Sequence, residues 1–555
     1  MDNRKFTYNA DRFRTIFENE FTYLQGFLRN THRYANRTAV TCPIRAKSWD
    51  YAGIDKEANK LAHALLMDGV AKSDIVMYQL FNCVEFVFLY LAPQKIGAIN
   101  CPINFRLSYG ETAYIIDDSK PKVYFYDAEL GDVAEKALNT ARHKPETVVM
   151  VDARGGHRPF GGAVSYTDYV ASRPDFAPEI VQPTNIYDET TRLYTSGTTG
   201  MPKGVPINNI NEIFSAHDVI MHFPISPRDK TMNMTPWFHR GGLYAGGPCP
   251  TLYVGGQLVI LRYFDAALIL DYVEKYELTF LIGAPATLKA LHDEQLKSHR
   301  KLEKLKGIVT MGAPLERNSC IQFQKVLTPN IFNGYGSTEA FWNCFLRPGD
   351  LPEKAGSTGR SCTDDDVAVV KVFPDRLAEP HEFAAKDNRE IGEIIVKPTA
   401  KCSFDYVNNP EAASARYYKG WLYIGDLGAW DENEFITVAG RKDDMIISGG
   451  ENIQPVQVEE ALNSHPRVSE NLVVGMPDEQ WGEIVVAYVV SNDPSLTARE
   501  LDEFCVGHPM LARYKRPRYY RFVENLPMTA TGKKLHYKMR AQAIEDAKAC
   551  LLEKV

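Results

Sequence analysis

The segment of the chain from Tyr194 to Gly204 has a composition suited to holding a polyphosphate. Its sequence, YTSGTTGMPKG, places three glycines, four aliphatic hydroxyls and one lysine within eleven residues. Backbone amides and hydroxyls can surround phosphate oxygens, and the ammonium of Lys203 supplies a counter-charge. The spacing from Gly197 to Lys203 and the glycine after the lysine do not fit a Walker loop. Taken by itself, the segment could instead be a solvated linker.

A second glycine-containing segment, NGYGSTE at 333–339, offers groups that suit a nucleotide and a magnesium ion. Its two glycines permit close backbone approach, and the ring of Tyr335 offers a stacking face. Thr338 and Glu339 provide the hard oxygen atoms that Mg²⁺ and phosphate prefer. In isolation these residues could equally form a turn with a surface glutamate.

Single polar residues elsewhere allow both a functional and a structural interpretation. Asp426 and Arg441 can bind the two hydroxyls of a ribose, because a carboxylate accepts hydrogen bonds and a guanidinium donates them. Alone, Asp426 could be a turn residue. His239, in PWFHRGG at 236–242, is as readily a structural histidine as a functional one. Lys533 in isolation is typical of a solvated charge.

Taken together and in this order, the segments resemble the motifs of the adenylate-forming superfamily. That superfamily comprises acyl- and aryl-CoA synthetases, adenylation domains of peptide synthetases and firefly luciferases, and the chain is most similar to the acyl- or aryl-CoA ligases. The resemblance covers about residue 50 to about residue 540. It implies an enzyme that uses ATP and Mg²⁺ to convert a small carboxylic acid to an acyl-adenylate and then transfers the acyl group to coenzyme A. The physiological direction stays open.

The resemblance also implies roles for individual residues. Lys203, His239, Thr338 and Lys533 would be catalytic groups, and Glu339 would hold the metal ion. The cofactor-binding residues that it implies are Thr195, Ser196, Gly197, Thr198, Thr199, Gly312, Ala313, Asn333, Gly334, Tyr335, Gly336, Asp426, Arg441, Gly449, Gly450, Trp481, Tyr514 and Arg516.

Two positions depart from the family pattern. Ile424 stands where threonine is commoner, and Lys534 replaces the apolar residue that usually follows the catalytic lysine. The choice of Lys533 over Lys534 therefore depends on its spacing from the preceding glycine. His239 is expected to orient the substrate and contact phosphate, because a carboxylate is already ionised near neutral pH and needs no base.

By the same resemblance, the acyl pocket lies among residues 236–242, 283–285, 311–314 and 334–341. Small residues there leave room, while large aromatic side chains limit the length of the acyl group. We therefore expect an aromatic, alicyclic or short-to-medium aliphatic acid rather than a long fatty acid. The limiting side chains are Trp237, Tyr335, Phe341 and Trp342.

The elements that must position these residues follow from hydrophobic periodicity. The pattern predicts helices at 54–66, 83–97 and 266–276, and strands at 75–80, 252–261, 280–283 and 307–311. Strands that alternate with helices of this length indicate an α/β fold with parallel and mixed sheets.

After residue 440 the pattern changes to short apolar strands at 471–475, 484–490 and 519–523, with a helix at 498–505. This is typical of a small α+β domain. We therefore predict a large multi-subdomain amino-terminal domain, residues 1–441, and a small mobile carboxyl-terminal domain, residues 442–555. By resemblance, the small domain rotates about Asp443 between the two half-reactions.

Bulk composition excludes several classes of partner. The formal net charge is -7, with Lys and Arg spread along the chain, which is untypical of a nucleic-acid-binding protein. The ten cysteines form no Cys-x-x-Cys pair, so we expect reduced, mostly buried thiols. No uncharged apolar run reaches the roughly 18 residues of a membrane span. We expect a cytoplasmic protein without a transmembrane segment, and a homodimer is an open possibility.

Three alternatives remain open beside a CoA ligase. The chain could load a carrier protein instead of free coenzyme A, or catalyse a luciferase-like oxygenation. It could also be a nucleotide- or acyl-binding regulator without catalysis, although the presence of Lys203, Glu339, Asp426, Arg441 and Lys533 argues against that.

Overall fold

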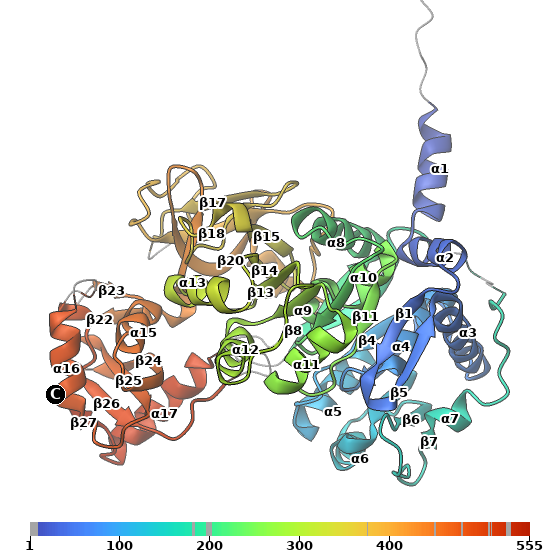
Figure 1. Cartoon of the computed structure of the whole chain (residues 1–555), viewed down its shortest axis with the longest axis horizontal. Helices are drawn as coiled ribbons and strands as arrows, with labels where there is room; N and C mark the ends of the chain where they lie inside the picture. Colours follow the sequence, from blue (N-terminus) through green and yellow to red (C-terminus); the bar gives the residue numbers. More distant parts are fainter. Residues whose placement is uncertain are drawn as a thin grey trace, which may run out of the picture. The chain divides into compact units, whose positions relative to one another are not determined.

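Of the chain, the computed structural model describes residues 9–179, 182, 184–195, 202–373, 376–448, 451–478, 481–508, 511, 513–528 and 534–555. The chain divides into two compact units, and Figure 1 colours it along the sequence. Unit 1 comprises residues 1–355, 361–366 and 398–420, and unit 2 comprises residues 356–360, 367–397 and 421–555. Unit 2 takes in stretches before residue 441 that the sequence pattern assigned to the larger domain. The boundary after residue 441 and the hinge near Asp443 stay predictions.

Two large sheets form the framework of the described part of unit 1. The first contains β1 (Thr38–Cys42), β2 (Lys47–Asp50), β10 (Lys230–Asn233), β11 (Gln257–Val259), β12 (Phe280–Gly283), β13 (Gly307–Met311), β14 (Ile331–Ser337) and β15 (Phe341–Leu346). The second contains β3 (Ile75–Gln79), β4 (Ile99–Pro102), β5 (Val123–Asp127), β6 (Thr147–Val151), β7 (Val164–Ser165), β8 (Glu189–Thr195) and β9 (Lys203–Asn208).

Most neighbouring strands in these sheets run parallel. The spatial order is β15-β14-β13-β12-β10-β11-β1-β2 in the first sheet and β7-β6-β5-β3-β4-β8-β9 in the second. Antiparallel pairs are β1–β2, β14–β15 and β8–β9. β12 and β13 are buried along their whole length, as expected for parallel strands covered on both faces. The predicted α/β class with parallel and mixed sheets is confirmed.

The described part of unit 1 also contains helices, most of which are labelled in Figure 1. They are α1 (Ala10–Glu20), α2 (Tyr23–Arg33), α3 (Tyr51–Met67), α4 (Val84–Ile96), α5 (Tyr109–Ser119), α6 (Gly131–Thr140), α7 (Tyr166–Tyr169), α8 (Asn209–His222), α9 (Arg240–Tyr244), α10 (Pro248–Val254), α11 (Ala266–Tyr276), α12 (Pro285–Lys297), α13 (Arg317–Val326) and α14 (Pro410–Ser414). The helices predicted at 54–66, 83–97 and 266–276 correspond to α3, α4 and α11.

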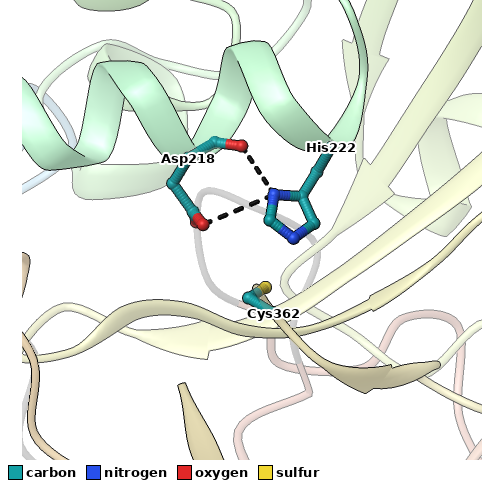
Figure 2. A group of neighbouring side chains, drawn as sticks. All are labelled: Asp218, His222 and Cys362. Carbon is teal, nitrogen blue, oxygen red and sulfur yellow. Dashed lines mark hydrogen bonds and ion pairs between the residues drawn. The ribbon is translucent and has the colours of Figure 1, made fainter. Parts of the chain in front are cut away.

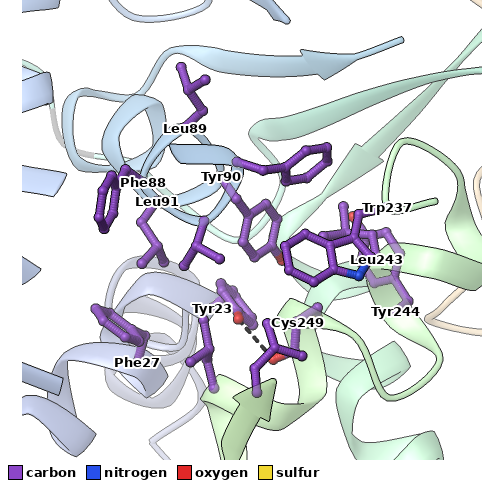
Figure 3. Packing of buried hydrophobic residues seen from close by; sticks show 14 of the residues in the cluster. Tyr23, Phe27, Phe88, Leu89, Tyr90, Leu91, Trp237, Leu243, Tyr244 and Cys249 are labelled. Atoms are coloured by element: carbon purple, nitrogen blue, oxygen red, sulfur yellow. Dashed lines mark hydrogen bonds between the residues drawn. The ribbon is translucent and has the colours of Figure 1, made fainter. Parts of the chain in front are cut away.

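Helix α4 lies in the middle of the main hydrophobic core. All of its residues are buried, which suits a helix that is apolar on every side. Figure 3 shows its Tyr90 beside Tyr23 of α2 and Trp237, with Cys249 of α10 nearby. The Tyr23 hydroxyl donates to the carbonyl oxygen of Cys249 at 2.8 Å, so this buried hydroxyl is satisfied.

The strand predicted at 252–261 is wrong in its first half. Leu252 and Val254 belong to α10, which begins at Pro248 and is capped by Gly255 in the left-handed region, with φ of 89°. Proline is favoured in the first helical turn and glycine after the last. The strand β11 covers only Gln257–Val259. A short apolar run alone could not separate helix from strand.

Unit 2 contains two further sheets in its described part. One contains β17 (Asp366–Val370), β18 (Gly392–Lys397), β20 (Trp421–Trp430) and β21 (Ile436–Arg441), in the order β17-β18-β20 with β21 paired to β20. The other contains β22 (Ile446–Ser448), β23 (Glu451–Ile453), β24 (Val468–Asp478), β25 (Gly482–Ser491), β26 (Tyr519–Phe522) and β27 (Glu553–Lys554). The short strands β16 (Arg360–Ser361) and β19 (Tyr417–Tyr418) lie at the sequence boundaries between the units.

The helices of unit 2 are α15 (Pro455–Asn463), α16 (Ala498–Gly507) and α17 (His536–Lys548). A capping box, in which Thr497 and Glu500 each bind the other's backbone amide, starts α16. The strands predicted at 471–475 and 484–490 are the middles of β24 and β25, and the helix predicted at 498–505 lies within α16. The α+β character of this region is confirmed.

The sequence also predicted reduced, mostly buried cysteines and no membrane-spanning segment. The cysteines are free thiols, and all are buried except Cys550, as predicted. Among the described helices, none has the length and apolarity needed to cross a lipid bilayer. The cytoplasmic location and the homodimer stay predictions.

Candidate functional site

The segment 333–339 lies on β14 and on the turn that leads to β15. A Cβ atom on Gly336 would lie 1.5 Å from the carbonyl oxygen of Phe341, and one on Gly334 would lie 2.7 Å from the indole of Trp342. Both positions therefore require glycine, because β15 passes directly against the backbone of β14. Phe341 itself has a φ of 61°, which is rare for an aromatic residue and marks a tight turn. This turn carries Glu339.

The carboxylate of Glu339 is buried and held by two side chains. Its Oε1 accepts a hydrogen bond from the hydroxyl of Tyr406 and lies 3.4 Å from Nη1 of Arg416. The backbone oxygen of Glu339 accepts from the amide of Ser403 at 2.7 Å. The segment around residues 403–416 therefore fixes both the backbone and the side chain of the predicted metal ligand.

Lys203 lies near the tyrosine that binds Glu339. Its Nζ is 5.4 Å from the centroid of the Tyr406 ring, the residue that also donates to Glu339. Lys203 begins β9 and is paired directly with Thr195, the last residue of β8. This pairing brings the two ends of the predicted phosphate loop together. Tyr406 thus connects two residues that the sequence assigned to one site.

His239 caps the short helix α9 through one of its two ring nitrogens. Its Nδ1 accepts from the amide of Gly242 at 3.0 Å. Burial lowers the pKa of His239 to about 4, so the imidazole is neutral near pH 7 and carries its hydrogen on Nε2. Nε2 is buried and has no hydrogen-bond partner among the described residues. A buried donor of this kind suits an oxygen of a bound carboxylate or phosphate.

The predicted ribose-binding pair is formed within unit 2. Asp426 on β20 and Arg441 on β21 are register partners, and Nη1 of Arg441 lies 2.6 Å from Oδ1 of Asp426. Gly425, with φ of 82°, allows the strand to present Asp426 at this point. Ile424, which departs from the family pattern, is buried. The departure is therefore a core substitution that leaves the carboxylate in place.

The residues predicted to contact coenzyme A lie on the surface of unit 2. Trp481 and Tyr514 are 46% and 45% exposed. Arg516 pairs with Asp502 at 2.7 Å through its Nε. The role of these residues in binding coenzyme A stays a prediction.

Lys534, the neighbour of the predicted catalytic lysine, is committed to another partner. Its Nζ lies 2.7 Å from Oε2 of Glu459, and Nε2 of His536 lies 2.8 Å from Oε1 of the same buried carboxylate. Burial by itself would raise the pKa of Glu459, but Lys534 and His536 outweigh that effect and lower the pKa to about 2. Lys534 therefore has a structural partner, which favours Lys533 as the catalytic residue.

The remaining predicted positions divide into described and undescribed residues. Gly312 follows β13 with a φ of 82°, and a Cβ atom added to it would have no neighbour within 4 Å among the described residues. Ala313 beside it is half-buried. Asn333 is buried and Tyr335 is half-buried on β14. Ser196, Gly197, Thr198, Thr199, Gly449, Gly450 and Lys533 lie outside the described residues.

Sequence reasoning missed Tyr406 and Arg416. Tyr406 lies 67 residues from Glu339 along the chain, and Arg416 lies 77 residues from it. Neither residue stands in a glycine-rich or hydroxyl-rich segment, so the sequence around each gave no indication of a functional role. Only the fold brings them to the carboxylate.

A separate cluster in unit 1 has the composition of a metal site. Ligand atoms of Asp218, His222 and Cys362 lie within 4.8 Å of one another (Figure 2). However, the ammonium of Lys401 lies 2.9 Å from Asp218 and 2.6 Å from Asp365. The carboxylate of Asp218 therefore already has a cation as its partner.

Both ring nitrogens of His222 are also engaged. Nδ1 lies 2.7 Å from the backbone oxygen of Asp218, and Nε2 accepts from the amide of Thr363 at 3.3 Å. Neither nitrogen offers a lone pair to a metal. We therefore interpret the cluster as a buried ion-pair network that joins α8 to the segments around residues 362–365 and 401.

Comparison with protein families identifies the family to which the chain belongs. The family model described as AMP-binding enzyme matches residues 27–400, and the model described as AMP-binding enzyme C-terminal domain matches residues 457–533. The chain belongs to the AMP-binding enzyme family. The predicted membership of the adenylate-forming superfamily is confirmed, and so is the prediction of an enzyme of the acid–thiol ligase kind.

Curated relatives of this AMP-binding enzyme are named as ligases. The indoleacetate–CoA ligase of Aromatoleum aromaticum is 32% identical over 506 residues, which cover 90% of this chain and 93% of the relative. The long-chain-fatty-acid–CoA ligase FadD13 of Mycobacterium tuberculosis is 30% identical, covering 89% and 92%. A fatty acid–[acyl-carrier-protein] ligase, ScoC of Streptomyces coeruleorubidus, is 28% identical, covering 93% and 96%.

Solved structures of AMP-binding enzymes share the fold along nearly the whole chain. The anthranilate CoA ligase AuaEII in complex with anthranoyl-AMP superposes with a TM-score of 0.84 at 26% identity, covering 95% of this chain and 98% of that one. The O-succinylbenzoate coenzyme A synthetase of Bacillus subtilis, in complex with ATP and magnesium ion, has a TM-score of 0.77 at 27% identity, covering 92% and 98%.

The described residues fit ATP and Mg²⁺. Glu339 offers a hard oxygen donor in a position fixed by Tyr406, and Lys203 lies against the same tyrosine. The buried Nε2 of His239 lacks a partner among the described residues. This donor set suits a magnesium-bound triphosphate with an anionic acyl substrate beside it.

Proposed function

We propose that this protein is an AMP-forming carboxylic acid:CoA ligase for a small aromatic, alicyclic or short-to-medium-chain carboxylate. The observation that carries the proposal is the meeting of Lys203 and Glu339 at Tyr406, in a chain of the AMP-binding family. A lysine and a metal-binding carboxylate at one point are the groups that phosphoryl chemistry requires.

In the first half-reaction, a carboxylate oxygen of the substrate attacks the α-phosphorus of ATP in line, and pyrophosphate leaves. The bond formed joins the acyl group to AMP as a mixed anhydride, and the bond broken links the α- and β-phosphates. Catalysis of this step consists mainly of positioning and charge neutralisation. Lys203 and Lys533 neutralise phosphate charge, and the neutral His239 donates from Nε2 to an oxygen of the substrate. Bound at Glu339, Mg²⁺ supplies further neutralisation of the triphosphate.

In the second half-reaction, the thiol of coenzyme A attacks the acyl carbonyl, and AMP leaves as the thioester forms. We propose that the small domain turns about Asp443 between the steps and presents Trp481, Tyr514 and Arg516 to the coenzyme. The exposure of Trp481 and Tyr514 supports this assignment.

The preference for a compact acyl group is supported by the packing around Gly334. The Trp342 side chain is buried, stacks on Phe341 with ring centroids 5.1 Å apart, and lies against Gly334. Its ring centroid is also 5.7 Å from that of Phe223. Aromatic rings therefore occupy the space beside Gly334, which supports an acyl group of limited length.

Loading of a carrier protein is the second candidate. The similarity to ScoC, named a fatty acid–[acyl-carrier-protein] ligase, favours keeping it. Both candidates share the adenylation step and differ only in the thiol acceptor.

The deciding experiment supplies ATP, Mg²⁺ and a panel of carboxylic acids with either coenzyme A or a pantetheinylated carrier protein. Release of AMP with formation of a thioester on coenzyme A is the expected result. Thioester formation on the carrier alone would establish the second candidate. ATP binding without AMP release for any acid would favour a non-catalytic regulator.

A further inference from the structure

Arg240 immediately follows His239, and its guanidinium connects three separate segments of unit 1. Nη1 donates to the backbone oxygen of Thr338 at 2.6 Å and to that of Glu339 at 3.5 Å. Nη2 donates to the hydroxyl of Ser215 on α8 at 3.0 Å. It also donates to the backbone oxygen of residue 401 at 2.6 Å. The turn that carries the predicted phosphate and metal ligands is thereby attached to α8.

Two aromatic rings hold the guanidinium in place. Its central carbon lies 5.4 Å from the ring centroids of both Tyr244 and Phe341. The Tyr244 hydroxyl in turn donates to the buried carboxylate of Glu212 at 2.9 Å. Because the rings are themselves fixed, the position of the guanidinium and of the carbonyls it binds is well determined.

A buried charge in this position needs an explanation. Arg240 is 3% exposed, and its four hydrogen-bond acceptors among the described residues are all neutral oxygens. Burial of a guanidinium without a paired carboxylate is costly, and it lowers the pKa of Arg240 from its ordinary value. An apolar side chain of the same length would avoid that penalty. The fork of donors is the property that such a side chain lacks.

We propose that Arg240 is a positioning residue for the turn at Thr338 and Glu339. By holding the two carbonyl oxygens, it fixes the backbone from which the Thr338 hydroxyl meets the α-phosphate and the Glu339 carboxylate meets Mg²⁺. Since Arg240 is adjacent to His239, it also ties the acyl-side donor to the phosphate-side ligands. The inference rests on the proposed function.

The test compares the affinities of the full-length protein for ATP with and without Mg²⁺, measured by titration calorimetry. Arg240→Lys keeps the positive charge but loses the pair of guanidinium donors, Nη1 and Nη2, and Arg240→Met loses both the charge and the donors. Ser215→Ala is the matched control, because it removes one contact of the guanidinium on α8 and leaves the contacts with residues 338 and 339. Thermal unfolding of each variant establishes that it is folded, and Arg240→Lys carries the test where Arg240→Met does not fold.

We expect Arg240→Lys to weaken binding of MgATP by on the order of tenfold, the scale of a lost hydrogen bond to a charged group. Binding of metal-free ATP should weaken by about threefold or less, since the metal ligand then plays no part, and Ser215→Ala should stay within about twofold for both. Equal loss with and without Mg²⁺, or affinities unchanged in both Arg240 variants, would overturn the inference. Absence of ATP binding by the unmodified protein would instead overturn the proposed function.

Discussion

The guanidinium of Arg416 lies 3.4 Å from the carboxylate of Glu339, so the proposed Mg²⁺ ligand already has a positively charged partner. A metal ion that binds this carboxylate competes with that partner. Arg416 is partly exposed, with 29% of its side chain accessible, and a pair of this kind contributes roughly 0.2–1 kcal/mol.

Removal of Arg416 should therefore ease metal binding. We predict that Arg416→Gln lowers the free Mg²⁺ concentration for half-maximal adenylation by about 1.4- to fivefold, the equivalent of that pair energy. The measurement is a Mg²⁺ titration of pyrophosphate release at saturating ATP. Arg142→Gln, which removes a surface arginine that is paired with Asp117, should leave the titration unchanged. A higher Mg²⁺ requirement in Arg416→Gln would contradict competition between the two cations.

Replacing Trp342 should lengthen the acids that the enzyme accepts. In Trp342→Ala the indole no longer fills the space beside Gly334, and each additional methylene of the substrate can gain about 1 kcal/mol there. We expect the ratio of kcat/KM for an eight-carbon acid to that for a four-carbon acid to rise by on the order of tenfold or more. Trp342→Leu should give a smaller rise in the same direction.

Trp49 provides the control for this prediction. It is buried against Phe88 and belongs to the same unit. Trp49→Ala should lower the free energy of unfolding by a few kcal/mol, about as much as other large-to-small core substitutions. It should leave the ratio of kcat/KM for the eight-carbon acid to that for the four-carbon acid unaltered. An unchanged ratio in both Trp342 variants would place the acyl pocket elsewhere.

Some elements of the fold were predictable from local patterns, whereas the site residues were assigned through the family resemblance. Asp426 by itself would have been interpreted as a turn residue, and the structure instead places it on β20 opposite Arg441 of β21. The strands at 280–283 and 307–311 were found because a parallel strand covered on both faces is apolar throughout.

The remainder depends on contacts that no local pattern encodes. Tyr406 and Arg416 reach Glu339 from 67 and 77 residues away, and Arg240 binds carbonyl oxygens nearly a hundred residues further along the chain. Such contacts exist only after the sheets have formed. The helix α10 was mistaken for a strand because tertiary packing, and not periodicity, decides the structure of a short apolar run.

The ion-pair network around Lys401 should be important for stability. Its ammonium is 3% exposed and forms ion pairs with both Asp218 and Asp365. Lys401→Met leaves two buried carboxylates without a cation, and we expect a loss of roughly 3–5 kcal/mol in the free energy of unfolding, measured with urea. Lys289→Met, which breaks a largely exposed pair with Asp293, should change it by no more than about 0.5 kcal/mol. Equal effects of the two substitutions would contradict this interpretation.

The same network predicts a pH dependence that arises from His222. Burial lowers the pKa of His222 to about 4; the hydrogen bond with the backbone of Asp218 opposes this effect, and the charges of Arg347 and Lys401 add to it. The unfolded chain has an ordinary histidine pKa near 6.5 and thus binds the proton more readily. The stability contributed by neutral His222 is therefore fully present above about pH 6.5 and is lost as the pH falls toward 4.

His222→Gln lacks this proton-binding group. The destabilisation that it causes at pH 7 should shrink by up to about 3 kcal/mol as the pH is lowered to 4, since only the unmodified protein loses stability through protonation of the histidine. Asp365, whose pKa burial raises to about 6, is present in both proteins and cancels in the difference. Urea unfolding at pH 4.5, 5.5 and 7 tests this, and a constant difference would contradict the assignment.

Exchange of labelled pyrophosphate into ATP, measured across a panel of carboxylic acids, tests the central claim most directly. The unmodified protein should catalyse exchange only when an acid is present, and Lys533→Ala should reduce the rate by on the order of 10²- to 10³-fold. Lys534→Gln should stay within a few-fold of the unmodified rate, because Lys534 is paired with Glu459 at 2.7 Å. The account would be contradicted if no acid in the panel supported exchange, or if Lys533→Ala exchanged pyrophosphate as fast as the unmodified protein.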